Sequence, residues 1–174
     1  MKQFLTLAAV VLTLSLFLAC NSDDDVVTPE TGDTPSGKLV SATECKSTLF
    51  KTDATMFGSD ESAVEYSYNA AARTLTLKHI NTAFNCCPGT LSATVHIEGD
   101  LITILEKESE ASCNCNCLYD IDIEIRNLPR KSWNVMVVEP YLTSPDLPLS
   151  FAIDLATTPS GRHAVPRSMY PWGI

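Results

Sequence analysis

The stretch from Cys113 to Arg126 constrains the fold of this chain more than any other. In CNCNCLYDIDIEIR, the odd positions hold cysteines, a tyrosine and isoleucines, and the even positions hold polar or charged side chains, except Leu118. Side chains of a β-strand point alternately to opposite faces. The pattern therefore predicts a strand with one face in a core, and a continuous strand places Cys113, Cys115 and Cys117 on the isoleucine face.

The rest of the chain is divided into short runs of similar alternation, with turn residues between them. Gly99-Asp100 is a two-residue hairpin signal. No window of a dozen residues outside the first twenty has a helical period. Short strands with a turn every eight to twelve residues predict an all-β sandwich or barrel. The expected strands are 39–45, 64–68, 74–80, 91–98, 101–107, 119–125, 132–139, 149–155 and 162–166.

One segment narrows the expected class. YDIDIEIRNLPRKSWNVMVV resembles the paired strands of immunoglobulin-like domains, in which a Leu-Pro turn precedes an aromatic-x-Val-x-Val strand. The resemblance implies a hairpin between residues 119–125 and 132–139, with Trp133, Val135 and Val137 on one face. We therefore expect a single immunoglobulin-like antiparallel β-sandwich over residues 38–174. Such a motif supports a fold and not a function.

The first residues have the composition of an export signal. Lys2 precedes an almost unbroken apolar run over residues 4–19, which is short for a membrane span of about 20 residues. The run ends in FLAC, which resembles a bacterial lipobox. The resemblance implies that residues 1–19 are a lipoprotein signal peptide and that Cys20 is lipid-modified. A plain secretory signal and a retained transmembrane helix are the alternatives.

An acidic run follows Cys20 directly. Ser22, Asp23, Asp24 and Asp25 resemble the export signal of Bacteroidetes surface lipoproteins, which implies display on the outer face of the outer membrane. An acidic run is also typical of a solvated, extended linker. Residues 20–37 are rich in Thr, Pro, Gly and acidic side chains, so they are expected to form a flexible tether.

Charge limits the possible partners. The chain has a formal net charge of −9 at pH 7, and loss of Lys2 with the signal peptide makes it −10. Such a protein is repelled by phosphate backbones, so nucleic acid is not an expected partner. Anionic head groups repel it as well, so the lipid on Cys20 is the expected membrane anchor.

Six cysteines remain after Cys20, and an even number in an exported chain favours disulfides. Residues i and i+2 of a strand lie about 6.6 Å apart with parallel side chains, which is at the limit for a bridge. A vicinal Cys86–Cys87 bridge would be strained. We expect each cysteine of CNCNC to pair with a cysteine elsewhere, with the connectivity open; the candidates are Cys45, Cys86, Cys87, Cys113, Cys115 and Cys117.

A thiolate metal site is the main alternative for these cysteines, and free buried thiols are another. The ligands of a zinc or copper(I) site would come from Cys86, Cys87, Cys113, Cys115 and Cys117. Against this, the chain has no CxxC, and a flat strand spreads three parallel thiolates too widely for one tetrahedral ion. No resident cofactor is therefore expected.

The sequence offers little for catalysis. His79, His96 and His163 are isolated; His96 is expected to face solvent and His79 to be half-buried beside the Leu75 and Leu77 face. No sequence motif for a nucleophile, a metalloprotease or a phosphate loop is present. Asp120, Asp122 and Glu124 form a carboxylate row that is expected to be a solvated strand face, with a cation site or an acid pair as the alternative.

The C-terminal residues RSMYPWGI contain two candidate ligand contacts. Tyr170 and Trp172 could form an aromatic platform for a sugar, or the tail could cross the sandwich and bury Trp172. Together with FNCCPGT and CLYDIDIEIRNL, this tail resembles uncharacterised Bacteroidetes lipoproteins with a cysteine-rich β domain. That resemblance implies no activity.

These observations lead to one functional expectation. The protein is expected to be a surface-exposed outer-membrane lipoprotein whose disulfide-stapled β-sandwich is a non-enzymatic binding or adhesion module for a glycan or a protein. The alternatives are a thiolate metal-binding lipoprotein and an enzyme or enzyme inhibitor.

Overall fold

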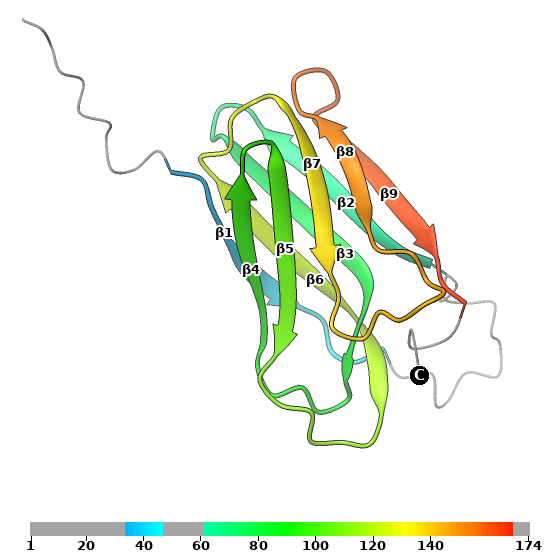
Figure 1. Ribbon diagram of the computed structural model, residues 1–174. Helices are drawn as coiled ribbons and strands as arrows, with labels where there is room; N and C mark the ends of the chain where they lie inside the picture. The colour runs from blue at the N-terminus through cyan, green and yellow to red at the C-terminus, as the bar shows by residue number, and fades with distance from the viewer. Residues whose placement is uncertain (1–33, 47–60, 169–174) are drawn as a thin grey trace, which may run out of the picture. The chain divides into compact units, whose positions relative to one another are not determined.

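The computed structural model describes residues 34–46 and 61–168 (Figure 1). The expectations for Cys20, for residues 22–25 and for Tyr170 and Trp172 lie outside these residues. The described part is all-β, as expected, and none of its segments is a helix long and apolar enough to cross a membrane. Its strands are β1 (Ser36–Ala42), β2 (Glu61–Asn69), β3 (Thr74–Asn85), β4 (Leu91–Glu98), β5 (Leu101–Glu108), β6 (Asn116–Arg126), β7 (Ser132–Val138), β8 (Ser150–Asp154) and β9 (Ser160–Pro166).

Each expected run of alternation is a strand, but two strand boundaries differ from the prediction. β6 begins at Asn116, so Cys113 and Cys115 lie in the preceding loop and only Cys117 is on the core face. β1 begins at Ser36, before the expected domain boundary at residue 38. Gly37 belongs to the strand because a Cβ atom there would lie 2.6 Å from Cγ2 of Val95 on β4.

The strands form one sheet in the order β8-β7-β5-β4-β1-β6-β3-β2-β9. All neighbours are antiparallel except β5 and β7, which run parallel. The expected hairpin between β6 and β7 is therefore wrong. Both edges of β6 are already paired, with β1 and β3, and the chain crosses the core to reach β5. The immunoglobulin-like class that rested on this hairpin stays a prediction.

The sheet curls so that two layers enclose the core. In Figure 1, β4, β5 and β7 lie in front of β6, β3 and β2. The edge strands β8 and β9 approach each other, and the ring of Phe151 stacks on that of His163 with centroids 4.6 Å apart. Each fully buried large aliphatic side chain contributes about 1.5–3 kcal/mol to stability. The largest buried core side chains are Phe84, Leu75, Leu77, Ile102, Ile104, Ile121, Ile123, Ile125, Leu128 and Leu149.

Candidate functional site

The six cysteines of the described residues gather at one end of the β1–β6–β3 part of the sheet. Cys86 and Cys87 follow β3, Cys113 and Cys115 precede β6, and Cys45 follows β1. β6 runs antiparallel to both β1 and β3, so the start of β6 lies beside the ends of its two neighbours. Sheet pairing therefore brings together cysteines that are far apart in the sequence.

Three disulfides connect these segments. Cys45 pairs with Cys117, Cys86 with Cys115, and Cys87 with Cys113, across Cα–Cα distances of 5.8, 5.6 and 5.4 Å. These distances are usual for a disulfide. The expected disulfides are therefore confirmed, each cysteine of CNCNC pairs outside the motif, and Cys86 and Cys87 have different partners. The sequence left this connectivity open.

Asn85 organises the loops beside the bridges. Its Nδ2 donates a hydrogen bond to the carbonyl of Cys113 (2.7 Å), and its Oδ1 accepts from the backbone N–H groups of Cys87 (2.9 Å) and Cys113 (3.1 Å). Its own N–H donates to Glu108 Oε2 (2.7 Å). A hydrogen bond to the same carboxylate raises the pKa of Tyr141 to about 12.

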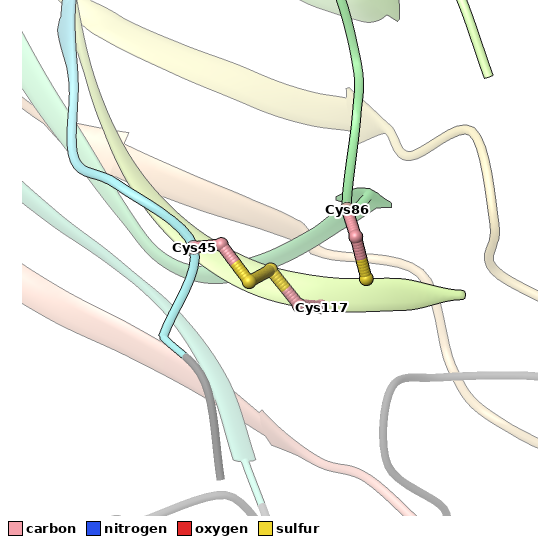
Figure 2. A group of neighbouring side chains, drawn as sticks. All are labelled: Cys45, Cys86 and Cys117. Atoms are coloured by element: carbon pink, nitrogen blue, oxygen red, sulfur yellow. A yellow bond between two sulfur atoms is a disulfide. The ribbon is translucent and has the colours of Figure 1, made fainter. Parts of the chain in front are cut away.

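The sulfurs of two bridges form one group. The Sγ atoms of Cys45, Cys86 and Cys117 all lie within 4.8 Å of one another. Figure 2 shows Cys86 directed toward the Cys45–Cys117 bridge, with the three side chains arriving from three different segments. Cys117 is buried, whereas Cys45 and Cys86 are partly accessible. Three soft sulfur ligands therefore converge on one point.

The carboxylate row of β6 has a partner at every position. Asp120 pairs with Lys46, Asp122 accepts a hydrogen bond from Ser41 Oγ (2.6 Å), and Glu124 accepts one from Arg126 Nε (2.6 Å). These carboxylates point to separate partners and not to a common centre. This agrees with the expected polar strand face.

A second polar group lies inside the core, between the two layers. His79 Nδ1 lies 2.7 Å from Glu106 Oε1, and His79 Nε2 lies 2.7 Å from Ser62 Oγ and 3.8 Å from Glu139 Oε1. Glu139 also pairs with Arg167. The side chains of His79, Glu106, Glu139 and Arg167 are at most 1% exposed. His79 is thus fully buried, not half-buried as predicted.

A β-bulge in β3 creates room for this network. His79 pairs with Ile121 and Thr82 with Tyr119, so β3 carries one more residue than β6 in that interval. Asn81, with φ of 63°, takes up the difference. A bulge shifts the alternation of a strand by one residue. The side chains of His79 and Thr82 both reach the core as a result, and Thr82 Oγ1 donates to Glu106 Oε2 (2.7 Å).

The buried charges balance when His79 is protonated. Burial opposes the charge on His79, but the carboxylates of Glu106 and Glu139 outweigh it and raise the pKa of the imidazole. Burial also raises the pKa of Glu139, although His79 and Arg167 oppose this. Two glutamates, one imidazolium and one guanidinium sum to zero, which is how a core tolerates charged groups.

Ser62, His79 and Glu106 are connected in the same atomic order as the triad of a serine hydrolase. Two observations favour a structural role. Ser62 is 0% exposed, so its hydroxyl cannot meet a substrate in this conformation. A raised pKa also keeps His79 protonated, whereas a general base needs the neutral ring.

Sequence reasoning missed several polar residues and located others correctly. His96 is exposed, as predicted. Asn85, Glu106, Glu139 and Arg167 were not singled out. A signal for Glu106 and Glu139 was present, because Glu106 has the parity of Ile102 and Ile104, and Glu139 that of Val135 and Val137.

Comparison of the chain with family models, with curated proteins and with solved structures finds no match. Inferences about function therefore rest on the residues and their geometry.

Proposed function

We propose that the protein is a lipid-anchored, surface-exposed lipoprotein whose stapled β domain is a non-enzymatic binding or adhesion module. The observation that supports this most is that all six cysteines of the described residues are paired in disulfides. Disulfides persist in oxidising, exported environments. The same bridges fix several loops at one end of the sheet, so a ligand meets a surface that loses little conformational entropy on binding.

Export and anchoring are assigned to the first residues of the chain. Cys20 carries the lipid, and Ser22 with Asp23, Asp24 and Asp25 directs the protein to the cell exterior. The test uses the full chain in a bacterium with an outer membrane, with labelled palmitate and with protease added to intact cells. We expect Cys20→Ala to abolish labelling.

Alanine at residues 22–25 separates anchoring from display. That variant should keep its palmitate label and become protected from external protease, because only the surface-export signal is lost. A variant that stays protease-sensitive on intact cells, or wild-type protein that takes up no palmitate, would contradict the proposed localisation.

The ligand contact is assigned to Tyr170 and Trp172, and the ligand is a glycan or a protein. The probe is a panel of immobilised polysaccharides, tested with the mature chain and with Trp172→Ala. We expect binding to at least one polysaccharide, weakened about tenfold or more by the substitution, because an aromatic face provides much of the contact with a sugar ring. Equal binding by the two proteins would remove Trp172 from the site, and binding to none of the panel would leave only a protein ligand in the proposal.

A further inference from the structure

The sulfur group at Cys45, Cys86 and Cys117 has a geometry that stapling does not require. Two bridges that tie different segments together can lie apart, as Cys87–Cys113 shows, because its sulfurs are outside this group. The sulfurs of Cys45–Cys117 and of Cys86 instead lie within 4.8 Å of one another (Figure 2). This contact between two bridges needs its own explanation.

The spacing is close to that of a metal–thiolate centre. In a tetrahedral zinc site with Zn–S bonds of about 2.3 Å, neighbouring sulfurs are about 3.8 Å apart. Cys86 needs a shift of about 1 Å to reach that spacing. Cys115 is bonded to Cys86, so it is the nearest candidate for a fourth ligand.

We propose that the reduced protein binds one thiophilic metal ion of the zinc class through Cys45, Cys86, Cys115 and Cys117. This proposal is independent of the adhesion function. It also differs from the metal site considered from the sequence, because Cys45 enters the ligand set and Cys87 and Cys113 leave it.

The backbone holds the ligand segments in place without the S–S bonds. On either side of Cys45, the N–H groups of Thr43 and Lys46 donate to the carbonyls of Asp120 and Leu118, each over 2.8 Å. The N–H of Cys86 donates to the carbonyl of Cys115 over 2.9 Å. Opening the two bridges therefore leaves four thiols at one end of an ordered sheet.

The chemistry of the switch is balanced as follows. A newly synthesised chain carries these cysteines as thiols before any bridge forms. In the folded protein, one phosphine reductant opens each bridge: it becomes a phosphine oxide with oxygen from water, and the two sulfurs gain two electrons and two protons. Metal binding then releases the thiol protons to solvent, because the thiolate is the ligand.

Access is provided by Cys115, the exposed member of the set, whereas Cys117 is 3% exposed. A reductant and a metal ion can therefore approach from the Cys115 side. Thiolate ligands select zinc or copper(I) over calcium and magnesium, which prefer oxygen.

The test uses the mature chain, reduced with a phosphine without oxygen and titrated with Co²⁺ as a spectroscopic substitute for Zn²⁺. We expect one Co²⁺ per chain, with the charge-transfer and visible bands of a tetrahedral thiolate site, and displacement of Co²⁺ by Zn²⁺. The Cys115→Ser variant should give the weaker charge-transfer band of three thiolates.

Two double variants form a matched pair, because each removes two cysteines. C45S/C117S should weaken Co²⁺ binding by about 100-fold, whereas C87S/C113S should bind as the wild type does. An unfolded reduced chain would lose affinity equally in both variants.

Three outcomes would overturn the proposal. They are no tetrahedral thiolate spectrum in the reduced wild type, equal loss in the two double variants, and loss of the β-sheet circular dichroism signal on reduction without recovery on metal addition. Each is measurable without knowledge of the adhesion ligand, so failure here leaves the binding-module proposal untouched.

Discussion

At the scale of single residues, Asn85 and His79 do the most with buried polar groups. Asn85 satisfies backbone groups of Cys87 and Cys113 next to the bridges, and His79 connects charged groups across the core. Both side chains are almost fully buried. Burying a polar group is tolerated only when its hydrogen bonds are made, so each residue is specified by its surroundings.

We expect Asn85→Ala to lower the free energy of unfolding by about 2–4 kcal/mol, because it leaves buried N–H and C=O groups without a partner. Asn114 is the matched control, since it is an exposed asparagine of the CNCNC loop. Asn114→Ala should change stability by less than about 0.5 kcal/mol. Urea unfolding of the disulfide-bonded protein measures both, and equal stabilities for the two variants would contradict the role given to Asn85.

His79 makes stability depend on pH with a defined sign. The pKa of His79 is raised in the folded state, so the native protein holds more protons than the unfolded chain at pH values above about 6.5. The stabilisation is complete below that pH and is lost as the pH rises through the folded pKa. Glu139 adds to this, because its pKa is also raised.

The free energy of unfolding should therefore fall between pH 6.5 and 9, by up to about 1.4 kcal/mol per pH unit for each proton retained. His79→Gln should flatten this slope, and His96→Gln, at an exposed histidine, should leave it unchanged. Denaturant unfolding across the pH range gives the slopes. A wild-type stability that is constant or rises over this interval would show that the imidazole is not held protonated.

At the scale of elements, alternation was enough to locate the strands and not enough to pair them. The parity of residues in β4, β5 and β6 follows directly from the apolar pattern. Pairing depends on contacts between distant segments, so the sequence around Leu128-Pro129 indicated a hairpin between β6 and β7 that does not form. The β3 bulge was also invisible, because it appears only when Asn81 is matched against the partner strand.

The two bridges that join the end of β3 to the loop before β6 should behave non-additively. Cys86–Cys115 and Cys87–Cys113 are nested and close loops of similar length, with separations of 29 and 26 residues. Either bridge alone restricts the unfolded chain almost fully. Replacing one pair by serine should cost less than about 1 kcal/mol, and replacing both should cost about 3–4 kcal/mol.

Cys45–Cys117 closes a separate and longer loop, with a separation of 72 residues. C45S/C117S should therefore cost about 4 kcal/mol whether or not another bridge is removed. Unfolding free energies of the single- and double-bridge variants provide the comparison. Losses that add for the nested bridges would contradict the entropic account of these staples.

At the scale of the whole molecule, the cysteines connect location, fold and proposed chemistry. The even number of cysteines after Cys20 predicted disulfides, and the strand geometry predicted that CNCNC would pair outside itself. The individual pairings could not be predicted, because they depend on β6 lying between β1 and β3. The close approach of Cys45 to Cys86 has the same origin.

The same limit applies to the buried network. Parity places His79, Glu106 and Glu139 on core-facing positions of three strands or strand ends. Parity does not reveal that they meet, since that depends on β5 and the end of β7 lying opposite β3. Sequence reasoning is therefore strongest for single elements and weakest for sites assembled from several of them.

The most direct test of the account is the covalent state of the exported mature protein, purified without reductant. Its mass should be lower by two hydrogens for each of three disulfides, with no thiol available for alkylation. Trypsin should leave residues 39–46, 79–107 and 108–126 joined as one species, with residues 39–46 attached through Cys45 to Cys117. Alkylatable thiols in these peptides, or residues 39–46 released without reductant, would contradict the stapled β domain.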